Sequence, residues 1–212
     1  MSTKLTPANL GDRLVASVTQ AGSPRSSPEL YRTLLRLLAR GVPVTIAQLA
    51  TTTGRSVDDV QRTVSGWSDT EYDHNGRIIG WGLTLRPTIH KFGLDGKQLY
   101  TWCALDTLFF PAVIGRTARI ESPCTATDIP VRIVVDPVAG VTALDPAGAV
   151  VSIVTPERMD SIRAAFCNPG RFFASREAAG NWQANHPGME VLSVIEAYWA
   201  SRSLSQALLE HS

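Results

Sequence analysis

Two cysteines and one aspartate lie in apolar, aromatic stretches of this chain. Cys103 and Asp106 are three residues apart in the stretch 99–111, so on a helix they share one face. Cys167 directly follows Phe166 in a second aromatic stretch. Thiolates bind soft metal ions preferentially, and a carboxyl beside a thiol can take up and return its proton. These residues therefore predict bond cleavage at a soft metal ion, with Asp106 shuttling the proton.

Structural roles for the same residues stay open at this point. A free cysteine is most often a small buried hydrophobe, and Asp106 could be a solvent-facing carboxylate at a helix end. That second alternative is weakened because Asp106 stands among leucines and phenylalanines, where an unpaired carboxylate is rare. If the helix begins near Trp102, Cys103 lies in its first turn, where the helix dipole lowers the pKa of a thiol. Cys124 lies in a turn-like stretch and is assigned a structural role.

Size and composition exclude several other classes of protein. The 212 residues can form one domain with a small partner, or two small domains, and a net charge of +1 gives no general attraction to nucleic acid or a membrane surface. Three cysteines do not form a disulfide framework, so we expect reduced thiols and a cytoplasmic protein. The N-terminus has no apolar leader and no stretch could span a bilayer, so a membrane is not an expected partner. The four histidines form no ligand-spaced pair, which argues against a conventional zinc site.

The N-terminal part, residues 1–83, has the pattern of a winged-helix-like domain. Three helices are expected within 28–67, and Asn75-Gly76 is a strong signal for a type I′ turn between two strands. The predicted elements are a weak helix at 9–19 and a linker at 21–28, helices from Leu30, at 46–53 behind the cap Thr45 and at 57–67 behind the cap Ser56, and strands at 71–74 and 77–83.

The presumed recognition helix of this domain carries Asp58 and Asp59 but only one base, Arg62. Phosphate contacts need lysine or arginine, and acids beside a DNA groove repel the backbone. Nucleic acid is therefore not the expected partner. We expect this domain to be structural, or to cover the second domain.

The second domain, residues 84–212, is predicted to be a mixed α+β catalytic domain, because short strands alternate irregularly with isolated helices. The whole chain is thus expected to be α+β. The predicted strands are 88–92 and 98–101 around a turn at 95–96, then 118–122, 131–135, 150–154, 172–174 and 191–195; the predicted helices are 102–110, closed near Pro111, then 156–166, 178–185 and 196–209.

At these residues the chain resembles the organomercurial (alkylmercury) lyase family. The resemblance extends from about Leu30 to Phe173 and is carried by residues 71–85, 99–117 and 165–167 with 172–175. Its most specific part is the run Trp102-Cys103-Ala104-Leu105-Asp106-Thr107-Leu108. The resemblance implies that Cys103 and Cys167 bind mercury, that Asp106 is catalytic and also contacts the metal, and that Cys124 is structural. Some members carry a second cysteine directly after the catalytic one, where this chain has Asn168.

The same resemblance implies a fold and an activity. The fold joins a winged-helix-like N-terminal part to an α+β catalytic part. The activity is protonolytic cleavage of carbon–mercury bonds, which gives a hydrocarbon and Hg(II) in mercury detoxification. No cofactor is required, and Hg(II) stays on Cys103 and Cys167 as product. External cellular thiols or mercuric reductase then take the ion, and Asn168 could alter that transfer.

Two other functions use the same thiols. A mercury- or thiol-responsive winged-helix transcriptional regulator would bind the metal without turnover, and it would shift promoter DNA in a salt-dependent manner. A redox enzyme with Cys103 as peroxidatic thiol would form a Cys103–Cys167 disulfide after peroxide.

Overall fold

The computed structural model describes Val15, Pro24 and residues 27–154, 161, 163–186 and 188–210. The helix predicted at 9–19, the linker at 21–28 and the first part of the helix predicted at 156–166 lie largely outside these residues. Within the described part of the chain, no helix has both the length and the apolar character needed to cross a membrane.

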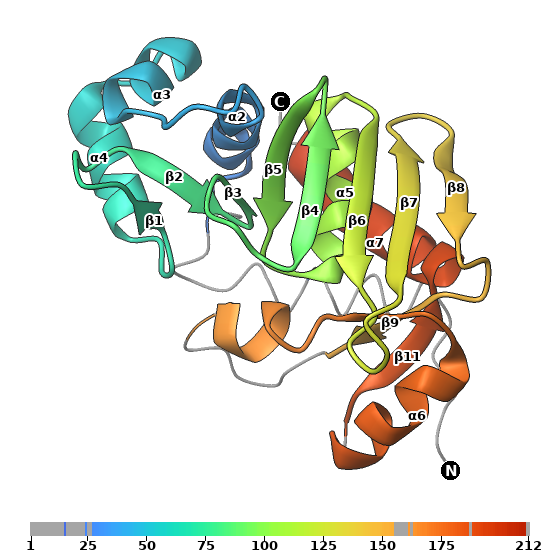
Figure 1. The fold of residues 1–212 in the computed structure, drawn as a ribbon. Coiled ribbons are helices and arrows are strands. Elements are labelled where there is room, and N and C mark those ends of the chain that lie inside the picture. The colour runs from blue at the N-terminus through green and yellow to red at the C-terminus, as the bar shows by residue number, and fades with distance from the viewer. Residues whose placement is uncertain are drawn as a thin grey trace.

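Three helices and a hairpin form the N-terminal module, shown on the left of Figure 1. The side chain of Thr45 accepts a hydrogen bond from the Gln48 N–H, and Ser56 accepts one from the Asp59 N–H, so both predicted caps are confirmed. The elements are α2 (Pro28–Leu38), α3 (Ile46–Thr53), α4 (Val57–Ser65), β1 (Glu71–Tyr72) and β2 (Ile78–Trp81).

The predicted hairpin is present, but its predicted type I′ turn is wrong. A type I′ turn needs positive φ at both central residues, and of the Asn75-Gly76 pair only Gly76 has one, at 71°. The Gly76 N–H donates to the Asp73 carbonyl at 3.1 Å. The Asp73 carboxylate also accepts hydrogen bonds from the N–H groups of Asn75 and Arg77, each at 2.9 Å. These bonds stabilise a turn that Asp73 begins and Gly76 closes in the left-handed conformation.

One antiparallel sheet continues from the N-terminal module into the rest of the molecule. Its strand order is β1-β2-β3-β5-β4-β6-β7-β8, so β3 joins the module to the later strands. β8 is missing from the predicted strands, because it is an edge strand whose side chains are mostly exposed and show little alternation. The added strands are β3 (Leu83–Thr84), β4 (His90–Leu94), β5 (Lys97–Thr101), β6 (Ala118–Pro123), β7 (Pro130–Asp136) and β8 (Gly140–Asp145).

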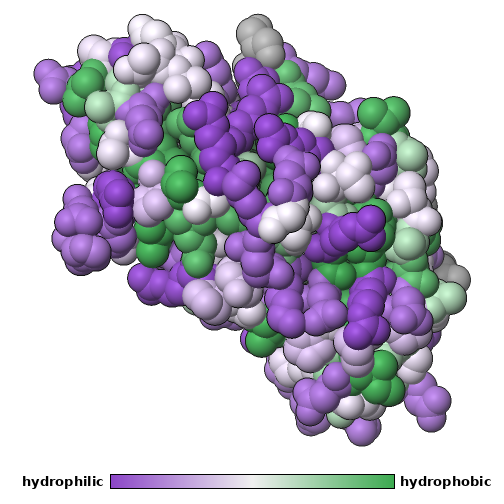
Figure 2. All heavy atoms as spheres, turned by 45° about the horizontal axis from the view of Figure 1, so that its top comes forward, coloured by the Kyte–Doolittle hydropathy of each residue, from purple (hydrophilic) through white to green (hydrophobic). Residues whose placement is uncertain are grey.

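Two helices, α5 (Ala104–Ile114) and α7 (Val194–Leu209), cover one face of this sheet and lie behind it in Figure 1. α5 packs against β4 to β7 and against α2 and α7, and nearly all of its side chains are buried. Hydrophilic side chains run across the middle of the face seen in Figure 2. The core therefore lies between the sheet and the helices, with α5 at its centre.

The predicted end of the central helix near Pro111 is wrong. α5 begins at Ala104 and passes through Pro111 to Ile114 before Gly115 ends it with φ of 80°. A proline inside a helix removes one backbone hydrogen bond. Here Val113 and Ile114 beyond it are buried in the core, and the free energy of that burial outweighs the lost bond.

A second, three-stranded antiparallel sheet lies below the large sheet in Figure 1. Its order is β10-β9-β11, and α6 packs against it. These elements confirm the strands and the helix predicted here, with small shifts at their ends. They are β9 (Val150–Ile153), one turn of π-helix η2 (Arg163–Cys167), β10 (Phe172–Phe173), α6 (Arg176–Asn185) and β11 (Glu190–Ser193).

Candidate active site

Cys103 lies between β5 and α5 and is the N-cap residue of α5. Its Sγ accepts a hydrogen bond from the Asp106 N–H at 3.4 Å, and an Asp106 carboxylate oxygen accepts one from the Cys103 N–H at 3.3 Å. This is a capping box in which a thiol and an aspartate replace the usual hydroxyl and glutamate. The sequence expectation that Cys103 occupies the first turn is therefore wrong by one position. The reciprocal bonds fix the thiol and the carboxyl side by side.

Cys167 ends η2, and a tight turn connects it to Cys103. The Gly170 N–H donates to the Cys167 carbonyl at 3.0 Å, and the Gly170 carbonyl accepts from the Ala104 N–H at 3.1 Å. A Cβ at Gly170 would lie 3.1 Å from Cys103 Cβ and 3.3 Å from the Cys167 carbonyl oxygen. Both distances are shorter than ordinary van der Waals contacts, so glycine lets the two cysteine-bearing segments approach this closely without displacing either one.

The structure brings the three predicted site residues together. The Sγ atoms of Cys103 and Cys167 and a carboxylate oxygen of Asp106 all lie within 4.8 Å of one another. The three residues are 0%, 3% and 2% exposed, respectively. The side chains packed around Cys103 leave no room for a water molecule at this point, and the residues that surround it are Leu105, Ser152, Ile153, Val154, Phe166 and Gly170. The cluster is thus closed off from solvent and mostly surrounded by apolar groups.

The electrostatics of Cys103 differ from the sequence expectation. Burial, the hydrogen bond with Cys167 and the charge of Asp106 raise the pKa of the Cys103 thiol well above its ordinary 9.0. The hydrogen bond from the Asp106 N–H lowers this pKa, but it is the weakest of these effects. The expected lowering by the helix N-terminus is therefore wrong, because desolvation dominates. Cys103 is protonated at neutral pH, so it needs a base to become a thiolate, and Asp106 is beside it.

Three further residues support the cluster. The Ser152 hydroxyl donates to the Pro169 carbonyl at 2.7 Å and accepts from the Arg171 N–H at 3.0 Å, so it holds the turn around Gly170. Burial lowers the pKa of the Arg171 guanidinium, and ionisation of the Cys103 thiol would raise it, so Arg171 lies within electrostatic reach of that sulfur.

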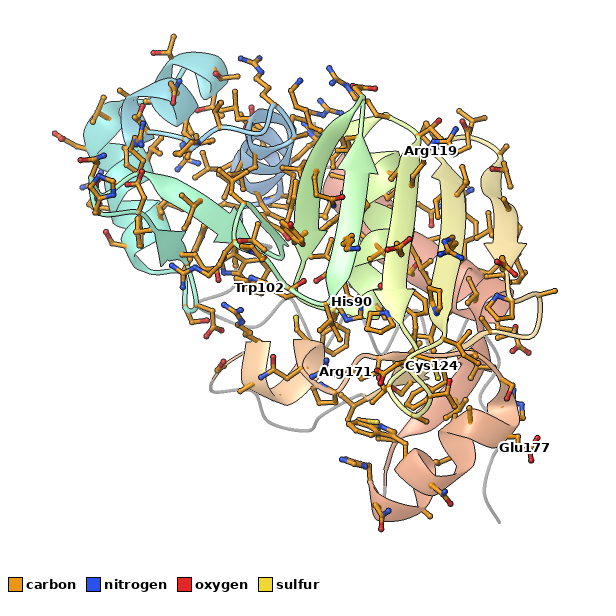
Figure 3. The ribbon with its side chains drawn as sticks, viewed as in Figure 1. His90, Trp102, Arg119, Cys124, Arg171 and Glu177 are labelled. Atoms are coloured by element: carbon orange, nitrogen blue, oxygen red, sulfur yellow. The ribbon has the colours of Figure 1, made fainter. Side chains whose placement is uncertain are left out.

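His90 is the third of these residues. Figure 3 shows His90 near Arg171, between the large sheet and the segment that follows η2. Its Nδ1 lies 2.9 Å from Ser122 Oγ, and its ring packs against Phe172 with the ring centroids 5.8 Å apart. Neither His90 nor Ser152 has a neighbour in sequence that points to the site; only the Pro169-Gly170 pair gives a local turn signal.

Cys124 lies outside the cluster. It is buried in a small separate group with Val150, Phe173, Ala179 and Val191. Burial acts to raise the pKa of its thiol, but hydrogen bonds with Thr127 and with nearby backbone N–H groups together lower that pKa below the ordinary 9.0. Its position agrees with the structural role that the sequence suggested.

The fold and the cluster together point to a class of protein: an α+β protein in which two thiols and a carboxyl lie together, the donor set for a soft, thiol-seeking metal. Comparisons with known proteins narrow this class. The family model described as alkylmercury lyase matches residues 83–206, and the model described as the helix-turn-helix domain of alkylmercury lyase matches residues 9–82. The chain belongs to the alkylmercury lyase family.

Individual relatives agree with this assignment. An alkylmercury lyase of Streptomyces lividans is 52% identical over 200 residues, which cover 94% of this chain and 93% of the relative. One from Bacillus cereus is 53% identical over 173 residues, covering 82% and 79%. The solved structure of the mercury-bound form of MerB2 matches with a TM-score of 0.77 and 23% identity, covering 94% of this chain and 98% of that one. At that identity the structural match shows the shared fold, and it confirms the expected α+β class with an N-terminal helical module.

Proposed function

We propose that this chain cleaves the carbon–mercury bond of organomercurials by protonolysis, with Cys103, Cys167 and Asp106 as its catalytic residues. The observation that carries the proposal is the buried cluster in which two thiol sulfurs and a carboxylate oxygen lie within 4.8 Å of one another. Family membership supports the reaction class, since the relatives are named alkylmercury lyases.

The first step is transfer of the organomercury group to the enzyme. The substrate arrives as R–Hg–SR′, with a small-molecule thiolate on the metal. One cysteine sulfur displaces that thiolate, and the displaced R′S⁻ leaves as R′SH with the proton of the cysteine. Mercury remains Hg(II) and keeps its bond to carbon. The apolar side chains beside Cys103 suit the organic group of such a substrate.

The second step breaks the carbon–mercury bond. Asp106 takes the proton from the other cysteine as its sulfur bonds to mercury, which makes the metal richer in electrons. The protonated Asp106 then gives this proton to the carbon, and the electron pair of the carbon–mercury bond becomes the new C–H bond. The hydrocarbon leaves, and Hg(II) stays bound to both sulfurs without any change of oxidation state.

Burial of the cluster sets the protonation of the first thiol. Cys103 is protonated in the resting enzyme, so it carries the proton that leaves with the displaced small-molecule thiol in the first step. Holding both thiols at one metal makes the reaction intramolecular, which can lower a barrier by up to ~7–11 kcal/mol. The reaction needs no organic cofactor in this scheme. External thiols, or mercuric reductase as acceptor, remove Hg(II) from Cys103 and Cys167. Asn168 directly follows Cys167, so it is the neighbouring residue when the ion leaves that sulfur.

The N-terminal module is proposed to serve the enzyme and not to read DNA. In our proposal the module comprises residues 1–83 and the catalytic domain residues 84–212. We also propose that the protein acts in the cytoplasm. Asp58 and Asp59 lie in the first turn of α4, and Arg55 is engaged by Asp59 at 2.7 Å, so the start of this helix does not present the free basic side chains that phosphate contacts need. The family match also disfavours the alternative of a mercury-responsive regulator without turnover.

The test is hydrocarbon release. Reduced protein is incubated with phenylmercury and excess thiol, and benzene is measured in the headspace. We expect multiple turnovers that are abolished in Cys103→Ser and in Cys167→Ser. Asp106→Asn should still bind Hg(II) but turn over about 10²–10⁴-fold more slowly, the usual contribution of general acid–base catalysis.

Cys124→Ser is the matched control, because it also removes a buried thiol but lies outside the cluster. It should lower the free energy of unfolding while the folded protein keeps its turnover. Tight mercury binding by the wild type with no benzene would exclude the lyase function, and full activity of Cys167→Ser would exclude the two-thiol mechanism.

A further inference from the structure

An ion pair connects the N-terminal module to the π-helical turn that carries Cys167. Arg163 is the first residue of η2, and its Nη1 lies 2.5 Å from Glu71 Oε1. The Glu71 side chain in β1 is only 5% exposed, whereas that of Arg163 is 34% exposed. A carboxylate this deeply buried is held in place by its partners, and removal of one partner is strongly destabilising.

The sheet is built around the Glu71 carboxylate. The Thr84 hydroxyl donates to Glu71 Oε2, and Gly80 pairs with Glu71 on one side and with Thr84 on the other. A Cβ at Gly80 would lie 2.5 Å from Glu71 Oε2 and 2.6 Å from Thr84 Cβ. Glycine at position 80 is therefore what leaves room for the carboxylate. Three adjacent strands, β1, β2 and β3, together fix one carboxylate oxygen and aim the other at Arg163.

A second carboxylate of the module holds the same segment. Asp69, just before β1, accepts a hydrogen bond from the Ser161 hydroxyl at 2.8 Å and a longer one from the Arg163 N–H at 3.4 Å. The backbone of Asp69 has a φ of 63°, in the left-handed region that residues other than glycine rarely adopt. Carboxylates of the module thus contact both the backbone and the side chains of the segment at the start of η2.

The Arg163 guanidinium also contacts the segment that carries the other cysteine. Its Cζ lies 4.9 Å from the centroid of the Trp102 ring, within the range of a cation–π interaction. Trp102 directly precedes Cys103, and the backbone N–H of Trp102 donates to the Gly82 carbonyl at 2.9 Å. Figure 3 shows Trp102 at the junction of the module and the sheet. One cation therefore lies between the Cys103 segment, the Cys167 segment and the N-terminal module.

We propose that Glu71 and Arg163 form a positioning pair that sets the approach of the Cys167 sulfur to mercury already bound at Cys103. This inference rests on the proposed function and extends it to the N-terminal module. Neither residue belongs to the cluster of sulfur and carboxylate donors. Cys103 is also held by the cap of α5, so loss of the pair should displace Cys167 more than Cys103. The first mercury–sulfur bond would then form normally, and the second would form slowly.

The experiment compares Glu71→Gln with Glu121→Gln. The first substitution keeps the shape and one oxygen acceptor but removes the charge. Glu121 is a matched control, because it also bridges cations, Lys91 at 2.8 Å and Arg132 at 3.2 Å, but on the exposed face of the sheet. For each protein we measure kcat and KM for benzene release from phenylmercury, and the retention of stoichiometric Hg(II) against a competing small thiol.

In Glu71→Gln we expect kcat to fall by about 10- to 100-fold while KM stays within about threefold, because a displacement near 1 Å has this effect on catalysis. Retention of Hg(II) should fall to that of Cys167→Ser, because only one sulfur still binds well. Glu121→Gln should match the wild type in every measurement. A purely structural role would reduce the number of folded molecules but leave kcat per mercury-binding site unchanged.

Wild-type kcat per site and wild-type retention in Glu71→Gln would overturn the proposal. If that variant does not fold, Thr84→Val provides the same decision, since it removes the hydroxyl that holds Glu71 Oε2 and keeps the shape of the side chain. It should lower kcat and Hg(II) retention in the same direction, and unchanged values would again overturn the proposal. Absence of benzene from the wild type would contradict the proposed function instead, while the retention measurement would still test the positioning pair.

Discussion

At the scale of single residues, the imidazole of His90 shows how strongly this interior disfavours charge. His90 is 1% exposed. Burial, with a contribution from the charge of Arg171, lowers its pKa from 6.5 to about 3, and the Gly170 backbone opposes this only partly. The same desolvation raises the pKa of Cys103. Charged forms in this region are therefore costly, and the Cys103 thiol keeps its proton.

The His90 shift predicts acid sensitivity. Between pH 6.5 and about 3 the unfolded chain protonates His90 and the folded protein does not, so the free energy of unfolding falls as pH falls through this window. At pH 4.5 the loss from this residue should be about 2–3 kcal/mol relative to pH 7. Urea unfolding at both pH values measures it. His90→Gln should lose less free energy of unfolding between pH 7 and pH 4.5 than the wild type. His74→Gln, which changes an exposed histidine in the hairpin turn, should lose as much as the wild type. Equal falls in wild type and His90→Gln would contradict the assignment.

The residue types singled out Cys103, Asp106 and Cys167, but only the family resemblance implied that the two cysteines meet, and the protonation of Cys103 did not follow from either. Cys103, Asp106 and Cys167 stand in stretches whose apolar character is visible in the sequence. The sign of the thiol pKa shift depends on how fully the folded chain excludes water, and that is set by distant segments. Likewise, the meeting of Cys103 and Cys167 depends on backbone bonds through Gly170, which no spacing rule predicts.

At the scale of secondary-structure elements, local signals predicted well where a side chain caps its own helix. Thr45 and Ser56 do this within three residues, and both helices begin as expected. The predictions were wrong where tertiary packing overrides a local rule. α5 continues through Pro111 because its far end is buried, and the Asn75-Gly76 turn changes type because Asp73 supplies its own hydrogen bonds.

The turn between η2 and β10 should tolerate a side chain at Gly170 poorly. Gly170→Ala would place a Cβ 3.1 Å from Cys103 Cβ, so one of the two cysteine-bearing segments must move. We expect a loss of about 1–3 kcal/mol in the free energy of unfolding, as in other overpacked cores, and slower benzene release. Gly180→Ala in α6 is the control, because a Cβ there meets no atom within 4 Å and alanine favours a helix. Urea unfolding and benzene release are measured for both variants. A wild-type free energy of unfolding and a wild-type rate in Gly170→Ala would show that the two cysteine-bearing segments do not need glycine here.

At the scale of the whole molecule, the large sheet crosses the point where the two family models meet. Those models meet at residues 82 and 83, yet β3 pairs with β2 on one side and with β5 on the other. The Glu71–Arg163 ion pair and the Asp69 contacts cross between the same two parts. The N-terminal module and the catalytic domain are therefore distinct in sequence but continuous in their hydrogen bonding.

This continuity predicts that the catalytic part does not fold alone. A fragment of residues 84–212 loses one of the two residues of β3 and all of β1, β2 and α2, so the edge of β5 and the apolar surface of α5 become exposed. We expect no cooperative thermal transition by circular dichroism and no benzene release from phenylmercury. The full-length chain is the control. A fragment that unfolds cooperatively and turns over at the wild-type rate would show that the module is dispensable.

The sulfur of Cys103 accepts the hydrogen bond that starts α5, a task that the hydroxyl of serine performs at the start of many helices. An inactive ancestor with serine at this position could therefore have had the same helix and the same fold. Exchange of one oxygen for sulfur would then add a metal ligand without demanding any rearrangement of the backbone. In evolutionary terms, the scaffold does not depend on the reaction, and the reactivity could be gained or lost at this position by a single substitution.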